Sequence, residues 1–213
     1  IRNFNTWNGM PYKERSLYNV FNTIQQKCSS NGIPNSISEE AKILYKTVSA
    51  IKISRGENRK GIIAACVFHA CKMRDVPRSA KEIAKIFDIQ IFIMTKGCKT
   101  FYQLYNSTKF NSKKLTKKPT EPLDFIDRFC SNLSMSEEVT NLAKDISNQA
   151  KEQNLTSKNT PPSIAVGSIY LSCNLLEIPC NKKEISEKCN ISEVTIGKCY
   201  KKLKNNLRLL KKE

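Results

Sequence analysis

Two stretches of this chain decide its fold: GIIAACVFHACKMRDVPRSAKEIAKIFDI at residues 61–89 and SIAVGSIYLSCNLLEIPCNKKEISEKCNI at 163–191. They align without a gap, and seven of the 29 positions are identical. A second pair, SISEEAKILYK at 36–46 and SMSEEVTNLAK at 134–144, extends the match toward the N-terminus. A period of about 100 residues is too long for a solenoid repeat. The pattern therefore predicts an internal duplication and two homologous helical domains.

Each copy is predicted to contain five helices, which makes the fold all-α. Glycine occurs only seven times in 213 residues, and no strand-like alternation of any length is present. In the first copy we expect helices over 12–27, from 36, over 57–74, from about 80 and over 91–105, with breaks at Gly32, Pro34 and Pro77. The small residues Ala64, Ala65 and Ala70 favour 57–74 as the central helix, because small side chains let neighbouring helices approach closely.

Helix starts are predicted from capping boxes, in which a Ser or Asn is followed three residues later by a Glu. The four candidates are Ser36 with Glu39, Ser79 with Glu82, Ser134 with Glu137, and Asn181 with Glu184. A fifth start is indicated where Thr160 precedes Pro161, since proline is favoured at the first helical position.

The net charge points to a polyanionic partner. With 36 basic and 19 acidic residues the chain carries +17, and nucleic acid is the partner that such an excess favours. Residues 1–105, the predicted first domain, carry +10, whereas residues 121–213, the predicted second domain, carry +2. Between them, 106–120 has five lysines and no acid, and is predicted to be a basic linker. No apolar run approaches the roughly 20 residues of a membrane span.

The nine cysteines are predicted to be free thiols in a reducing compartment, because their number is odd and no CxxC pair occurs. Cys66, His69 and Cys71 resemble a metal site. On a helix, however, Cys66 and Cys71 point about 140° apart, so the three cannot converge on one ion. We therefore expect no metal here. The chain also lacks a glycine-rich phosphate loop, a partner motif for its single histidine and paired carboxylates, so we expect no enzymatic activity.

The segment KEISEKCNISEVTIGKCYKKL, residues 183–203, predicts a helix-turn-helix with its turn at Asn190 and its second helix begun by Ser192. The spacing of Ile185, Ile191 and Ile196 fits the core of such a unit. A second helix of this kind enters the DNA major groove with its first turn on base edges. The residues expected to face outward are Val194, Thr195, Lys198, Lys201 and Lys202.

Together these segments resemble the cyclin fold, and above all the core domain of transcription factor IIB. The resemblance rests on IRNFNTW, AACVFHACKMRDVPRSAKEI, FIDRFCSNLSM, PPSIAVGSIYLSC and KEISEKCNISEVTIGKCYK, and it spans essentially the whole chain. It implies a monomeric nuclear factor, without a cofactor in this fragment, that binds the TATA-binding protein on promoter DNA and recruits RNA polymerase II. The chain begins without a methionine and is predicted to be a fragment, with the family's zinc ribbon expected upstream of Ile1.

The resemblance also assigns candidate DNA contacts. The family's helix-turn-helix reader falls on Val194 and Gly197, and Gly197 stands where the family usually has arginine. Its first-repeat loop near the minor groove falls on Arg55 and Gly56, followed by Glu57 where relatives often have arginine. The further candidates for DNA are Arg59, Lys60, Lys182, Lys183, Thr195, Lys198, Lys201 and Lys202. The candidates for the acidic edge of the TATA-binding protein are Lys72, Arg78 and Lys81.

Three other interpretations remain open. A cyclin-type kinase regulator shares the fold but needs neither the +17 charge nor a basic helix-turn-helix. The related RNA polymerase III factor shares both repeats and normally has a long extension after the second. A helical enzyme acting on nucleic acid is disfavoured because no acid–base set is present. DNA binding, with and without the TATA-binding protein, separates the first of these from the main hypothesis.

Overall fold

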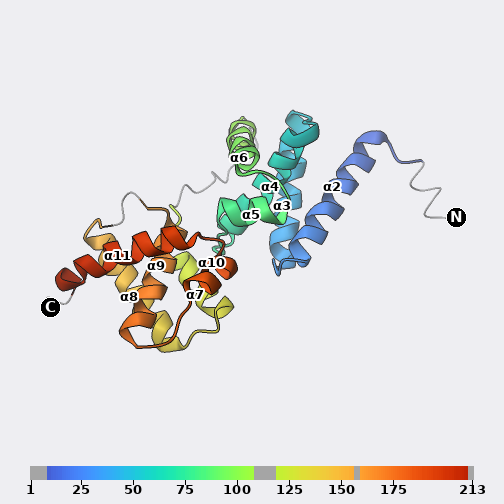
Figure 1. Cartoon of the computed structure of the whole chain (residues 1–213). Coiled ribbons are helices and arrows are strands. Elements are labelled where there is room, and N and C mark those ends of the chain that lie inside the picture. The colour runs from blue at the N-terminus through green and yellow to red at the C-terminus, as the bar shows by residue number, and fades with distance from the viewer. Residues whose placement is uncertain (1–8, 108–118, 156–158, 211–213) are drawn as a thin grey trace. The chain divides into compact units, whose positions relative to one another are not determined.

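The structure, a computed structural model, describes residues 9–107, 119–155 and 159–210. The chain divides into two compact units, residues 1–117 and 118–213. The first contains α2 (Tyr12–Ser29), α3 (Asn35–Ile51), α4 (Gly56–Met73), α5 (Ala80–Ile86) and α6 (Ile91–Asn106) (Figure 1). The second contains α7 (Leu123–Asn132), α8 (Glu137–Glu152), α9 (Pro161–Leu175), α10 (Lys182–Cys189) and α11 (Glu193–Leu210).

Every regular element in the described ranges is a helix, so the all-α prediction with five helices in each unit is confirmed. The predicted linker at 106–120 lies mostly outside the described residues, and the predicted domain limits therefore stay a prediction. No helix in the described part of the chain is long and apolar enough to cross a membrane.

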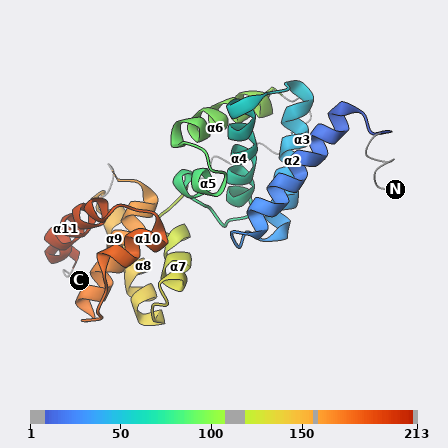
Figure 2. The same cartoon turned by 45° about the vertical axis from the view of Figure 1, so that its right-hand side comes forward.

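Each unit is built around one buried helix. In the first unit α4 lies between α3 and α6 in both views (Figures 1 and 2), and the predicted small residues Ala64, Ala65 and Ala70 are fully buried. In the second unit α9 is the corresponding third helix, and it too is buried on all sides over most of its length, with Ala165 and Ile169 fully buried. A helix buried all round has no polar face, which explains why neither segment shows a helical hydrophobic stripe.

Glycine sets how closely the central helix and the last helix of the first unit approach. A Cβ atom added at Gly97 on α6 would lie 2.2 Å from the carbonyl oxygen of Gly61 on α4. One added at Gly61 would lie 2.7 Å from the carbonyl oxygen of Ile93. Only residues without a side chain fit at such distances, so this helix crossing depends on both glycines.

The helix starts follow the predicted capping residues only in part. Ser79 and Glu82 form the full capping box, with each side chain bonded to the other's backbone N–H. Asn181 caps α10 by accepting from the Lys183 N–H instead of forming a full box with Glu184. Thr160 lies directly before α9, whose first residue is Pro161, as predicted.

The boxes predicted at Ser36 and Ser134 are wrong. Pro34 ends the preceding loop, so α3 begins at Asn35 and Ser36 lies inside its first turn. Ser134 has a φ of 55°, because it takes the left-handed position that ends α7. Two residues later Ser136, which is extended, caps α8, and its hydroxyl accepts from the Val139 N–H over 3.5 Å.

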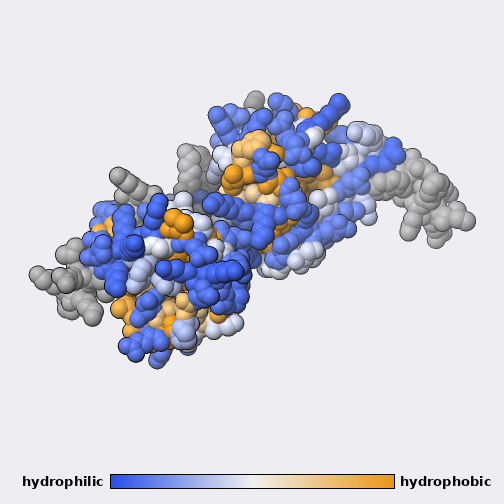
Figure 3. Space-filling view, in the orientation of Figure 1, coloured by the Kyte–Doolittle hydropathy of each residue, from blue (hydrophilic) through white to orange (hydrophobic). Residues whose placement is uncertain are grey.

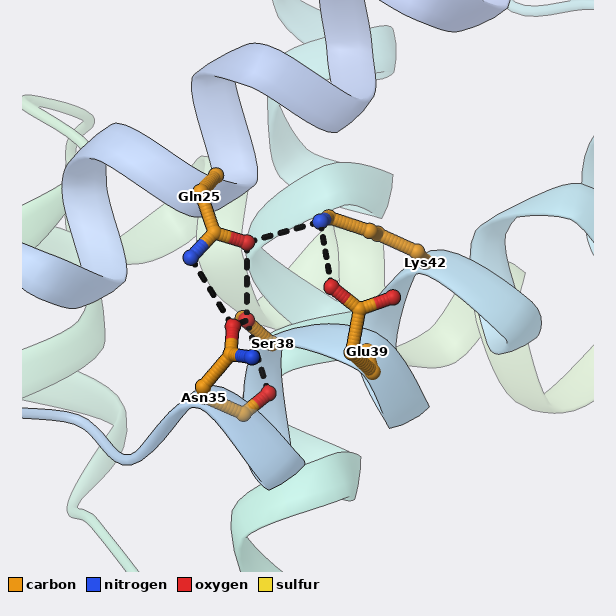
Figure 4. A network of polar contacts seen from close by, with 5 residues as sticks. All are labelled: Gln25, Asn35, Ser38, Glu39 and Lys42. Carbon is orange, nitrogen blue, oxygen red and sulfur yellow. Dashed lines mark hydrogen bonds and ion pairs between the residues drawn. The ribbon is translucent and has the colours of Figure 1, made fainter.

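A polar network joins α2 to the start of α3 (Figure 4). The Gln25 amide nitrogen donates to Asn35 Oδ1 over 2.9 Å, and its oxygen accepts from Lys42 Nζ over 2.7 Å and from the Ser38 hydroxyl over 3.1 Å. Lys42 also pairs with Glu39 over 2.6 Å. Because the Ser38 side chain is fully buried, its bond to Gln25 compensates for the loss of its water contacts.

Candidate nucleic-acid interface

The helix-turn-helix of the second unit consists of α10 and α11. Asn190 ends α10 in the left-handed conformation, with φ 56° and ψ 38°, which turns the chain as predicted. The Ser192 hydroxyl then accepts from the Thr195 N–H over 3.3 Å and begins α11. The predicted core is confirmed, because Ile185, Ile191 and Ile196 are all buried.

The outer face of α11 carries three exposed candidates. Val194 is 66% exposed, and Lys198 and Lys201 are exposed on the same side, since positions i, i+4 and i+7 share one face of a helix. Gly197 lies among them, and a Cβ atom there would meet nothing within 4 Å. This face therefore presents one apolar side chain and two ammonium groups around Gly197, which has no side chain.

Thr195 and Lys202 do not belong fully to this face. Both are only partly exposed, and the Thr195 hydroxyl shares a 2.8 Å hydrogen bond with Ser192, so it contributes to the cap of α11. On α10, Lys183 is exposed. The ammonium of Lys182 lies 5.2 Å from the centre of the Tyr170 ring, a cation–π contact that holds it against α9.

The candidate loop of the first unit ends at α4. Arg55 is exposed and extended directly before the helix, and Gly56 has a φ of 56°, which favours glycine. Lys60 forms an ion pair with Glu57 over 2.7 Å, so part of its charge is already balanced. Arg55 therefore carries the one candidate guanidinium of this loop that extends into solvent.

Arg59, which was predicted to contact DNA, is held in the fold by three hydrogen bonds. Its Nε donates to the Tyr45 hydroxyl over 3.1 Å, and its Nη2 donates to the Ser16 carbonyl over 2.9 Å and to the Ser16 hydroxyl over 2.6 Å. The guanidinium thus ties α4 to α2 and α3. These bonds hold the start of α4 next to the loop that presents Arg55, and the assignment of Arg59 to DNA stays a prediction.

The three candidates for the TATA-binding protein lie between the end of α4 and the first turn of α5. Lys81 is exposed, whereas Lys72 and Arg78 are partly buried. On the same helix end, Arg74 pairs with Glu40 over 2.9 Å. The assignment of Lys72, Arg78 and Lys81 to a partner stays a prediction.

The group that resembled a metal site is part of the core. Cys66, His69 and Cys71 are all buried, and burial raises the pKa of the Cys66 thiol. The His69 ring stacks on Phe101, with ring centres 4.6 Å apart, and forms a T-shaped pair with Tyr102, with ring centres 4.7 Å apart. Among the residues that the structure describes, no three His, Cys, Asp or Glu side chains gather so that they could hold a metal ion.

Comparison with known proteins places both units in one family. The Transcription factor TFIIB repeat matches residues 13–104 and again residues 115–206. The chain is 40% identical over 211 residues to a transcription initiation factor IIB-like protein of Acanthamoeba polyphaga mimivirus, covering 92% of this chain and 45% of that protein. It is 31% identical over 196 residues to Transcription initiation factor IIB of Methanosphaerula palustris, covering 91% of this chain and 56% of that protein.

The chain thus spans about half the length of these curated relatives. Among solved structures, a chain of the yeast RNA Pol II CTD kinase CTDK-1 complex superposes with a TM-score of 0.43 at 16% identity, over 92% of this chain and 67% of that one. That likeness is too low to bear on function. The matched family is one of transcription factors and not of enzymes, as the sequence predicted. Because its repeat matches two segments that together make up most of the residues, the chain belongs to the transcription factor IIB family.

Proposed function

We propose that this chain is the core of a general transcription initiation factor that binds the TATA-binding protein on promoter DNA in the nucleus and helps recruit RNA polymerase II. The relatives named as transcription initiation factors support this, as does the net charge of +17. The single observation that carries the proposal is the helix-turn-helix of the second unit, whose outer face presents Val194, Lys198 and Lys201 to solvent.

In this proposal α11 enters the major groove. Val194 makes an apolar contact with a base, and Lys198 and Lys201 hold phosphates, which fix the position on DNA without reading its sequence. Lys183 at the start of α10 and Lys202 flank these contacts. Gly197 offers no side chain that could pair with the two acceptors of a guanine. The second unit therefore binds duplex DNA with little base discrimination.

The first unit contributes Arg55 and the backbone at Gly56 on the downstream side of the TATA box, supported from behind by Arg59. The surface around Lys72, Arg78 and Lys81 meets the acidic edge of the TATA-binding protein. Residues 1–105 carry +10, which suits an acidic partner. Because phosphate contacts dominate, binding to DNA alone is weak and falls steeply with salt.

A mobility-shift titration on a TATA duplex, with and without the TATA-binding protein, tests the proposal. We expect a ternary complex that requires the TATA-binding protein and that Lys198→Glu/Lys201→Glu weakens at least tenfold. The control Lys13→Glu/Lys46→Glu changes two exposed lysines of α2 and α3 by the same charge and should weaken binding much less.

Tight, sequence-specific binding by the chain alone would contradict the proposal, as would equal losses in the two double variants. Adding RNA polymerase II or RNA polymerase III to the ternary complex then tests which polymerase the complex binds. A supershift with polymerase III alone would assign the chain to that initiation system. Binding to a kinase without any binding to DNA would favour the cyclin interpretation.

A further inference from the structure

Cys173 and Cys180 form a pair of thiols where the chain enters the helix-turn-helix of the second unit. Cys173 lies in the last turn of α9, and Glu177, which has a left-handed φ of 55°, reverses the chain after that helix. The Ile178 N–H donates to the Cys173 carbonyl over 2.9 Å and holds the reversed chain against the helix end. Cys180, two residues further along, therefore packs on the hydrophobic cluster to which Cys173 belongs.

The two thiols differ in exposure and in acidity. Cys173 is fully buried, and its sulfur lies 3.9 Å from the Met135 sulfur. Cys180 is partly exposed, and its sulfur accepts a hydrogen bond from the Cys173 thiol. This bond lowers the pKa of Cys180, against smaller opposing effects of burial and of the Glu184 carboxylate. The pair thus places a readily ionised sulfur at the surface and a second sulfur directly behind it.

The other cysteines of the chain provide a comparison. Of the nine, Cys98 and Cys180 are partly exposed and the rest are buried. Burial raises the pKa of Cys98 to about 11. Because the thiolate is the form of cysteine that reacts with oxidants, Cys180 is the more reactive of these two. The pair occurs in the second repeat only, since Cys71 matches Cys173 but Arg78 stands where the second repeat has Cys180.

The surroundings of Cys180 give a small, water-soluble oxidant access to its sulfur. The side chain lines an open surface pocket together with the polar residues Asn181, Lys182 and Glu184. Hydrophilic residues also dominate the face of the second unit that Figure 3 shows, with small hydrophobic patches among them. A solvent-accessible cysteine of low pKa beside a second thiol is the arrangement of a redox-sensing cysteine.

We propose that Cys180 is an oxidation site and that Cys173 converts its oxidised form into a reversible disulfide. The disulfide would tie the start of the helix-turn-helix to the end of the central helix α9. The inference goes beyond the proposed function and does not depend on it.

Hydrogen peroxide is the oxidant in this proposal. The Cys180 thiolate attacks one peroxide oxygen, the O–O bond breaks, and a sulfenic acid and hydroxide form. The Cys173 sulfur then displaces hydroxide from the Cys180 sulfur and gives up its proton, so that an S–S bond and water result. Together the two thiols lose two electrons and two protons, and one peroxide becomes two waters. Two molecules of a thiol reductant such as glutathione restore both thiols and leave as their own disulfide.

Mass spectrometry after brief peroxide treatment tests the proposal. The reduced protein is treated with hydrogen peroxide, its remaining thiols are alkylated with N-ethylmaleimide, and the chain is cleaved after glutamate. Because Glu177 lies between the two cysteines, cleavage there should leave two peptides held together by the disulfide. Reduced glutathione should separate them again. We expect Cys180 to be oxidised at least about tenfold faster than Cys98.

Three variants separate the roles of the two sulfurs. Cys180→Ser should form no disulfide. Cys173→Ser keeps a hydroxyl that can donate to the Cys180 sulfur but removes the second thiol, so the sulfenic acid should persist and be captured by dimedone. The matched control Cys98→Ser should form the disulfide as readily as the unaltered protein does. Far-UV circular dichroism verifies that each variant is folded.

The outcomes decide between this pair and nonspecific oxidation. Equal rates of oxidation at Cys98 and Cys180 would overturn the proposal, because the fold would then give Cys180 no special reactivity. A disulfide to another cysteine, or no dimedone capture in a folded Cys173→Ser protein, would overturn the role of Cys173. A disulfide between Cys173 and Cys180 that forms first and that glutathione reverses would support it.

Discussion

The stability of the first unit should depend on pH through His69. This side chain is 2% exposed, and its Nε2 has no hydrogen-bond partner among the described residues. Burial, with a smaller effect from the Lys72 ammonium, lowers the pKa of His69 from 6.5 to about 4. The ring is therefore neutral in the folded protein at any pH well above 4.

The direction of the effect follows from where the proton binds. In the unfolded chain His69 takes up a proton as the pH falls through about 6.5, whereas in the folded protein it resists protonation until about pH 4. The free energy of unfolding is thus fully retained above pH 6.5 and is lost progressively between pH 6.5 and 4. Between pH 7.5 and pH 5.0 the loss from this one group amounts to about 2 kcal/mol.

Urea titrations followed by far-UV circular dichroism at the two pH values measure this loss. The variant His69→Leu introduces the residue that the second repeat has at the corresponding position, the buried Leu171. It should lose about 2 kcal/mol less between pH 7.5 and 5.0 than the unaltered protein does. Phe68→Leu changes a neighbouring ring and keeps His69, so it should retain the full pH dependence. If His69→Leu and the unaltered protein lose equal stability, then His69 is not held neutral by the fold.

Three further predictions concern the helix crossing and the DNA surface. Gly97→Ala places a Cβ atom against the Gly61 carbonyl and should destabilise the first unit by about 3 kcal/mol, measured by urea titration. Gly197→Ala has open space around its new Cβ atom, so it should instead stabilise the second unit by about 0.5–1 kcal/mol. Gly197→Arg should create a guanine preference of about 1–3 kcal/mol upstream of the TATA box, measured by competition with G·C pairs replaced by A·T; a tenfold loss already present in the unaltered protein would refute it. Arg59→Ala should lower the stability of the first unit by about 1.5–3 kcal/mol. Arg55→Ala should change that stability by no more than about 0.5 kcal/mol and should weaken DNA binding instead. The reverse result would mean that Arg55 supports the fold and Arg59 contacts DNA.

The duplicated stretch was sufficient to predict the helices, because each copy supports the other wherever one alone is ambiguous. The capping patterns predicted the helix starts less reliably. Ser79 caps α5 because the chain before it is extended, but Ser134 resembles it in sequence and lies in a left-handed position that closes the previous helix. A capping box covers only four residues, but the backbone conformation of the residues before it also decides which residue caps the helix.

The candidate site shows where sequence alone fails. Arg59 looked like a free basic residue, because its partners Ser16 and Tyr45 lie 43 and 14 residues away in the chain. Only the folded helices bring the three together.

The glycine contact between α4 and α6 also shows how the two copies differ. Gly97 corresponds to Cys199 of the second repeat, and there the space is provided by Gly167 on the central helix, whose added Cβ would lie 2.7 Å from that of Cys199. Each copy thus has a tight crossing, but in the first copy Gly61 and Gly97 face each other from both helices, whereas in the second Gly167 of the central helix faces Cys199. A gene conversion that carried the last helix of the second copy into the first would set a cysteine against the Gly61 backbone. The helices α6 and α11 therefore cannot replace each other, although they descend from one duplicated sequence.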